Sequence, residues 1–316
     1  MAGLEIIVKN DVTLTFGTYD FDIASDGLRV TGGTWSFSTG YWYDHSNTSF
    51  VSDVRILGTG NPANVTAGHF RVYGTNDDAG VSRYVNCLYR ATDITTTFTR
   101  MNCKFDRVSF VNCGFELNIL QTSYAGVELV EAVTMTNCHF EAMANGANAY
   151  LIKLAGNDSS VNNSEILGKS NTTIGIYHAG YYNQVNDCTF SLHTRSIWST
   201  GSDFMMTGNF FKLPNGVSAY GVRLDAARQQ VVGNQFNSGT TGAISVRLES
   251  GADDCVITGN TMYNAATGIS ISSVSCEDNL ISGNSLEGIT GTEIVDGGTR
   301  TVVKANQPDS VNKYER

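Results

Sequence analysis

Short segments of alternating apolar and polar residues recur along the chain at a nearly constant interval. A six-residue pattern with apolar ends and an Asn, Asp or Gly at its third position starts at residues 110, 135, 161, 185, 206, 231, 257 and 281, so successive starts differ by 21 to 26 residues. The copies read FVNCGF, MTNCHF, VNNSEI, VNDCTF, MTGNFF, VVGNQF, ITGNTM and ISGNSL. Eight copies at one period indicate a structural repeat.

A second series of strand-like segments keeps step with the first. It includes LIKLAG (151–156), SIWSTG (196–201), GVRLDA (221–226) and SVRLES (245–250). Neither series shows the 3.6-residue period of a helix. A unit of about 24 residues cannot bury its own apolar face, so the units must stack. The sequence therefore predicts an all-β, single-stranded parallel β-helix, a solenoid in which each repeat is one rung.

Stacked rungs place equivalent residues in columns. The fourth position of the six-residue pattern reads Cys113, Cys138, Ser164, Cys188, Asn209, Asn234, Asn260 and Asn284. We expect the Asn side chains to hydrogen-bond along this column as an amide ladder. Cys113 and Cys138 fall near enough for a disulfide, but free thiols are expected, because reduced Cys packs as a small buried hydrophobe.

Composition and charge exclude several classes of function. The 316 residues carry a formal net charge of -10, with a pI near 4.9. This charge disfavours binding to nucleic acid or to an anionic membrane surface. No apolar segment is long enough to span a membrane, and the start, MAGLEIIVKNDV, lacks the features of a signal peptide. The seven Cys show no metal-binding spacing, and no cofactor is expected.

Three regions are expected along the chain. Residues 1–100 form an N-terminal cap and irregular opening rungs, 101–300 the regular β-helix, and 301–316 a C-terminal cap or extension. MNCKF (101–105) and VNCGF (111–115) are too close together to occupy one position on successive rungs. The aromatic segment TWSFSTGYWYDHSNTSF (34–50) is interpreted as a cap over the open end of the coil, with a sugar-binding loop as the alternative.

The ITGNTM and ISGNSL copies, with TGISIS between them, resemble the repeats of right-handed parallel β-helices of the pectate-lyase-like superfamily. The absence of a signal peptide, the thiols and the acidic, Gly/Asn/Thr-rich composition are most similar to a bacteriophage tailspike. This resemblance implies a homotrimer on the virion tail, assembled in the host cytoplasm alongside other tail proteins. It also implies a bacterial surface polysaccharide, capsule or O-antigen, as partner.

The VRL segments predict which side chains face outward. Val222 and Leu224 point into the coil, so Arg223 and Asp225 point out, and the same holds for Arg247 and Glu249 one rung later. Two carboxylates on adjacent rungs are about 5 Å apart at the backbone, which suits the acid and the nucleophile or base of a glycosidase. We therefore expect Asp225 and Glu249 to be catalytic.

The neighbouring columns supply candidate substrate-binding residues. Trp198 and Tyr177 offer flat faces for sugar stacking, and Arg223, Arg247 and Lys153 suit an acidic sugar. Asp203 lies in a turn that would form the wall of a groove. His178 is expected to face inward.

These residues predict a depolymerase that hydrolyses a surface glycan. Alternatives are an ordinary surface ion-pair ladder on a non-catalytic adhesin or structural spike, a polysaccharide lyase, and a site shared between subunits of a trimer.

Overall fold

The structure is a computed structural model that describes residues 4–24, 26–46, 48–60, 69–73, 81–91, 101–119, 125–145, 149–169, 173–214, 219–239 and 242–307. The described residues form strands and turns and no α-helix. The chain divides into two units, Met1–Glu165 (unit 1) and Ile166–Arg316 (unit 2). Within each unit the chain visits three parallel sheets, here called A, B and C, in a fixed order. The predicted parallel β-solenoid is confirmed.

Unit 1 contributes strands to all three sheets. Its sheet A contains β1 (Glu5–Ile7), β4 (Arg29–Thr31), β7 (Phe50–Ser52), β10 (Ser82–Val85), β13 (Val108–Val111), β16 (Thr134–Thr136) and β19 (Ser160–Asn162). Its sheet B contains β2 (Thr13–Gly17), β5 (Thr34–Phe37), β8 (Arg55–Gly58), β11 (Leu88–Ala91), β14 (Gly114–Ile119) and β17 (His139–Asn145). Its sheet C contains β3 (Phe21–Ile23), β6 (Trp42–Asp44), β9 (Phe70–Tyr73), β12 (Met101–Asp106), β15 (Ala125–Leu129) and β18 (Tyr150–Leu154). Strand β20 (Glu165–Leu167), of sheet B, contains the boundary between the units.

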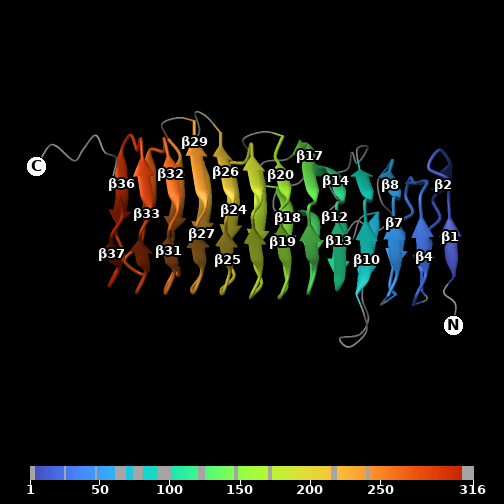
Figure 1. Ribbon diagram of the computed structural model, residues 1–316, viewed down its shortest axis with the longest axis horizontal. Helices are drawn as coiled ribbons and strands as arrows, with labels where there is room; N and C mark the ends of the chain where they lie inside the picture. Colours follow the sequence, from blue (N-terminus) through green and yellow to red (C-terminus); the bar gives the residue numbers. More distant parts are fainter. Residues whose placement is uncertain are drawn as a thin grey trace, which may run out of the picture. The chain divides into compact units, whose positions relative to one another are not determined.

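Unit 2 repeats the arrangement. Its sheet A contains β22 (Gln184–Asn186), β25 (Met205–Thr207), β28 (Gln230–Val232), β31 (Val256–Thr258), β34 (Leu280–Ser282) and β37 (Val302–Lys304). Its sheet B contains β23 (Thr189–Ser191), β26 (Phe210–Leu213), β29 (Gln235–Ser238), β32 (Thr261–Tyr263) and β35 (Ser285–Glu287). Its sheet C contains β21 (Ile174–His178), β24 (Arg195–Ser199), β27 (Tyr220–Leu224), β30 (Ile244–Leu248), β33 (Thr267–Ile271) and β36 (Thr292–Asp296). Figure 1 shows β25, β31 and β37 lying along the same side of the unit.

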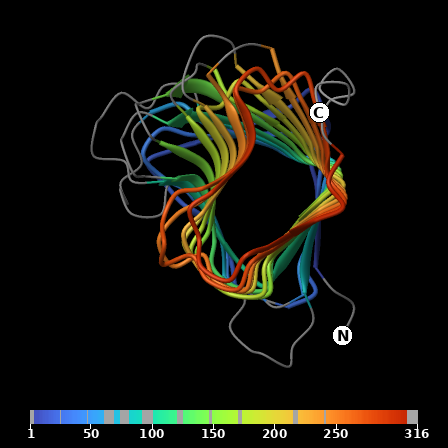
Figure 2. The ribbon, with the colours of Figure 1, turned by 90° about the vertical axis from the view of Figure 1, so that its left-hand side faces the viewer.

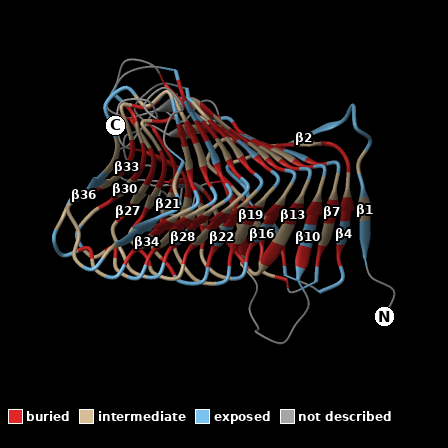
Figure 3. Cartoon of the chain, turned by 60° about the vertical axis from the view of Figure 1, so that its left-hand side comes forward, coloured by how far each residue is buried: buried red, intermediate tan, exposed pale blue. Residues whose placement is uncertain are grey.

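The six-residue pattern turns the corner from sheet A to sheet B. Val231 and Phe236 are fully buried on either side of the corner, and Gly233 takes a positive φ of 64° between them. Glycine adopts this left-handed conformation without steric cost. Along the coil axis the strands of unit 2 overlie one another on three sides (Figure 2). Buried residues follow the inward positions, as the red segments on the sheet A strands of unit 1 illustrate (Figure 3).

The predicted amide ladder is present in unit 2. Nδ2 of each Asn donates to Oδ1 of the next, at 2.9 Å from Asn209 to Asn234, 3.1 Å from Asn234 to Asn260 and 2.9 Å from Asn260 to Asn284. Each Oδ1 also accepts from the backbone N–H of the preceding Asn, at 2.9 to 3.0 Å. The ladder thus satisfies buried polar groups that would otherwise cost stability. All seven Cys are free and buried, as expected.

Two features of the N-terminal half take definite positions. MNCKF belongs to β12 of sheet C, whereas the first residues of VNCGF belong to β13 of sheet A. The two segments therefore lie on different sides of the coil, joined through Arg107 at a positive φ of 49°. Trp35, Phe37 and Trp42 of the aromatic segment lie in β5 and β6 and are buried in the interior of unit 1.

Candidate functional site

The predicted outward column lies on sheet C of unit 2. Strand pairing places Tyr177 beside Trp198, Trp198 beside Arg223, Arg223 beside Arg247 and Arg247 beside Ser270. The side chains between them, including Val222 and Leu224, are fully buried. The alternation along each strand therefore leaves the column residues on the outer face. We call this column, with Asp225 and Glu249, the sheet C platform.

Trp198 is the centre of the platform. The guanidinium carbons of Arg195 and Arg223 each lie 5.0 Å from the centre of its ring, a distance typical of cation–π contacts. The Tyr177 ring meets it edge-on, with centroids 5.2 Å apart. Its indole Nε1 donates a 2.8 Å hydrogen bond to Oδ2 of Asp225. The contacts hold both the aromatic ring and the carboxylate in defined orientations.

Each candidate carboxylate is paired with an arginine of its own strand segment. Arg223 binds Asp225 through two hydrogen bonds, from Nε at 2.8 Å and from Nη2 at 2.9 Å. Nε of Arg247 lies 2.6 Å from Oε1 of Glu249, and Ser272 donates a 2.6 Å hydrogen bond to Oε2 of Glu249. The side chains of Asp225 and Glu249 remain 16% and 23% exposed. Both carboxylates are therefore oriented by donors yet reachable from solvent.

Two residues that contact the platform were not predicted from the sequence. Arg195 packs against Trp198, and Tyr220 accepts a 2.6 Å hydrogen bond from Nη1 of Arg247. Both precede two consecutive buried positions, so the strict alternation that located the other residues fails there. A small residue marks this break, as at Gly221, where a Cβ atom would lie 2.5 Å from Cδ1 of Phe236.

Two further predicted substrate-binding residues are each paired with a side chain of opposite charge. Lys153 belongs to unit 1, where its Nζ lies 3.4 Å from Glu128. Asp203 lies in the turn from sheet C to sheet A in unit 2, where Arg228 donates hydrogen bonds of 2.7 and 2.8 Å to it. This pairing lowers the pKa of Asp203 below its ordinary value.

His178 faces inward as predicted. Its Nδ1 lies 2.7 Å from Oγ of Ser199, and its ring stacks on Phe204 with centroids 4.1 Å apart. Burial lowers its pKa to about 3, so the ring is neutral at physiological pH. This places His178 in the interior packing of unit 2.

Clusters that could hold a metal ion and helices that could cross a membrane are both absent from the described residues. In the ranges that the structure describes, no three or more His, Cys, Asp or Glu residues gather in a way that could hold a metal ion. Those same ranges hold no helix with the length and apolar character needed to cross a membrane.

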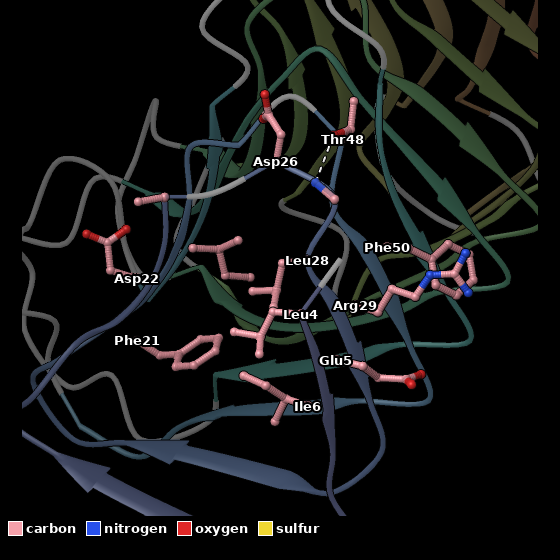
Figure 4. A pocket seen from close by; sticks show the side chains of 13 residues that line it. Leu4, Glu5, Ile6, Phe21, Asp22, Asp26, Leu28, Arg29, Thr48 and Phe50 are labelled. Carbon is pink, nitrogen blue, oxygen red and sulfur yellow. Dashed lines mark hydrogen bonds between the residues drawn. The ribbon is translucent and has the colours of Figure 1, made fainter. Parts of the chain in front are cut away.

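A large depression of about 900 Å³ lies at the first rung of unit 1 (Figure 4). Apolar side chains of β1, β3 and the segment before β4 line it, including Leu4, Ile6, Phe21 and Leu28. A 2.9 Å hydrogen bond from Gly27 N to Thr48 Oγ1 crosses its rim.

The sequence matches no protein-family model and no curated protein. Solved structures do match. A tailspike protein double mutant of E. coli bacteriophage HK620 aligns with a TM-score of 0.63 and 12% identity over 93% of this chain and 60% of that chain. A tailspike mutant of the same phage in complex with a hexasaccharide aligns with a TM-score of 0.52 and 10% identity, over 95% of this chain and 73% of that chain. A double mutant of the periplasmic alginate epimerase AlgG aligns with a TM-score of 0.56 and 9% identity, over 96% of this chain and 77% of that chain.

These similarities establish the fold class. The chain has the parallel β-helix fold shared by the phage tailspike and the epimerase, as the sequence resemblance predicted. It spans about 60% of the length of the first tailspike chain. At such low identity the likeness concerns the fold alone.

Proposed function

We propose that this chain binds a bacterial surface polysaccharide on the sheet C platform of unit 2 and cleaves a glycosidic bond there. The observation that carries the proposal is the array of Trp198, Arg223 and Asp225, an aromatic ring, a cation and a carboxylate held together at an exposed surface. Aromatic faces stack on sugar rings, and guanidinium groups bind carboxylates of acidic sugars. The hexasaccharide bound to the HK620 tailspike supports a glycan as partner.

In this proposal Asp225 and Glu249 share the hydrolytic work. Asp225 receives hydrogen bonds from Trp198 and Arg223, which fix the orientation of its carboxyl group for a role as nucleophile or base. Glu249 is the proton donor to the leaving oxygen. An acidic sugar at Arg247 would compete with Glu249 for that guanidinium and release Glu249 toward the bond. Water supplies the hydroxyl and the proton that complete the two products.

A binding role without cleavage is the second candidate. It is favoured by the ion pairs themselves, because Arg223 and Arg247 already satisfy both carboxylates. Exposed pairs of this kind also occur as ordinary surface ladders.

Reducing-end release from a panel of purified capsular and O-antigen polysaccharides separates the two candidates. Release that disappears in a folded Asp225→Asn/Glu249→Gln variant supports hydrolysis at the platform. Release that persists in that variant places the chemistry elsewhere, including at a boundary between subunits. Formation of an unsaturated uronate would indicate a lyase.

The similarity to tailspike structures also suggests an oligomeric state and a location. We propose a homotrimer on a phage tail, with other tail proteins as neighbours. Sedimentation equilibrium of the purified chain tests the trimer directly.

A further inference from the structure

A depression lined by polar side chains lies at the turns from sheet C to sheet A in unit 2. None of its lining residues belongs to the platform. Its volume is about 410 Å³, within the range of small-molecule sites. Three successive rungs line it, and we call it the corner pocket: Tyr182, Asn183, Gln184, Asp203, Phe204, Met205, Arg228 and Gln230.

The arrangement of the corner pocket follows from the strand register. Gln184 pairs with Met205, and Met205 pairs with Gln230. The carboxamides of Gln184 and Gln230 therefore lie two rungs apart, roughly 10 Å at the backbone. The thioether of Met205 lies on the rung between them. In the turns that precede Met205 and Gln230, the bidentate pair of Asp203 and Arg228 presents further donors and acceptors.

Tyr182 completes the pocket at a local cost. It takes a positive φ of 57° and leaves its side chain 63% exposed. For a residue with a bulky side chain this conformation is unfavourable, whereas Asn and Asp adopt it readily. Five residues take the same conformation at the corresponding turns of other rungs of unit 2: Asp203, Arg228, Asp254, Asp278 and Arg300. Folding therefore does not require an aromatic residue at this position, and the exposed Tyr182 ring is available to a ligand.

We propose that the corner pocket binds one hydroxyl-rich sugar residue. The Tyr182 ring stacks on the apolar face of the sugar. Gln184, Gln230, Asp203 and Arg228 exchange hydrogen bonds with its hydroxyl groups, and Met205 forms the floor. The choice of a sugar as ligand rests on the proposed glycan-binding function; the site itself rests on its own geometry.

Saturation-transfer NMR tests the pocket with four free probes: glucose, galactose, N-acetylglucosamine and glucuronate. We expect signal from at least one probe with the wild-type protein. In Tyr182→Asn we expect that signal to fall at least about five-fold while the melting temperature rises by about 2 °C or more, because strain is relieved. Leu192→Asn is the matched control, since Leu192 also has a positive φ, 63°, is exposed and lies outside the pocket. It should gain stability and keep the signal.

Three outcomes overturn the corner pocket. One is the absence of signal from all four probes with wild-type protein. Another is unchanged signal in Tyr182→Asn. The third is a signal that Trp198→Ala abolishes and Tyr182→Asn leaves intact, which would assign the sugar to the platform instead. Polysaccharide cleavage is measured separately by reducing-end release, so failure of the corner pocket and failure of the proposed function can be told apart.

Discussion

The indole Nε1 of Trp198 donates a 2.8 Å hydrogen bond to Oδ2 of Asp225, from one rung of unit 2 to the next. The same carboxylate receives both hydrogen bonds from Arg223, whose guanidinium lies 5.0 Å from the Trp198 ring. Three residues on two adjacent rungs thus orient one another. Substituting any one of them should therefore change the orientation of the other two, so the role of the platform can be tested by mutation.

Two substitutions of Trp198 distinguish the contribution of its aromatic ring from that of its hydrogen bond. Trp198→Phe keeps an aromatic face for stacking and loses the donor to Asp225, whereas Trp198→Ala loses both. We expect glycan affinity to fall by about ten-fold or more in Trp198→Ala and by less in Trp198→Phe, because a stacked aromatic contact contributes about 1 kcal/mol or more. Isothermal titration with a polysaccharide bound by wild type measures this. Equal losses in the two variants would argue against a stacking role.

Removing both platform carboxylates should abolish cleavage without unfolding the protein. Asp225→Asn/Glu249→Gln is expected to reduce reducing-end release by at least about 100-fold, the scale of positioned acid–base catalysis. Glu277→Gln/Asp278→Asn is the matched control, because these exposed carboxylates are also paired with an arginine, Arg300. The control should keep wild-type release. A platform variant as active as the control would remove Asp225 and Glu249 from the mechanism.

The amide ladder should be essential for the stability of unit 2. Asn234 is 1% exposed, accepts from Asn209 through its Oδ1 and donates through its Nδ2 to Met206 O at 3.1 Å. Asn234→Ala leaves these buried groups without partners, so we expect the free energy of unfolding to fall by about 2–4 kcal/mol. Urea denaturation measures the loss. Asn237→Ala is the control, because Asn237 is an exposed residue of β29 in the same unit, and its loss should be about 0.5 kcal/mol or less.

Buried histidine should make unit 2 less stable in acid. Burial lowers the pKa of His178 to about 3, against an ordinary value of about 6.5. Between these values the unfolded chain binds a proton that the folded chain does not, so the stabilisation present above pH 6.5 is lost as the pH falls. From pH 6.5 to pH 4.5 the expected loss from this residue is about 2.3 kcal/mol.

Comparing the pH dependence of two variants isolates that contribution. His178→Gln should show a smaller drop in unfolding free energy between pH 7 and pH 4.5 than wild type, measured by urea denaturation. His139→Gln should behave like wild type, because His139 is 41% exposed. An identical pH dependence for all three proteins would show that His178 titrates normally in the folded state.

The repeat by itself determined much of this protein. A period of about 24 residues with two-residue alternation requires stacked parallel strands, because the small units have nowhere else to bury their apolar residues. Stacking then places Asn209 above Asn234 and Trp198 beside Arg223 without further information. The direction in which the side chains point also followed from the sequence, because the apolar Val222 and Leu224 belong in the interior of the coil.

Only the tertiary structure decided what happens at the corners. Alternation fails where the chain turns, so the sequence did not place Arg195 and Tyr220 beside the platform. Nor did it show that Tyr182 holds a left-handed conformation beside Arg228, because turn geometry depends on contacts between rungs. The pairing of Asp225 with Arg223 and of Glu249 with Arg247 likewise depends on side-chain orientations, which the alternation of apolar and polar residues does not specify.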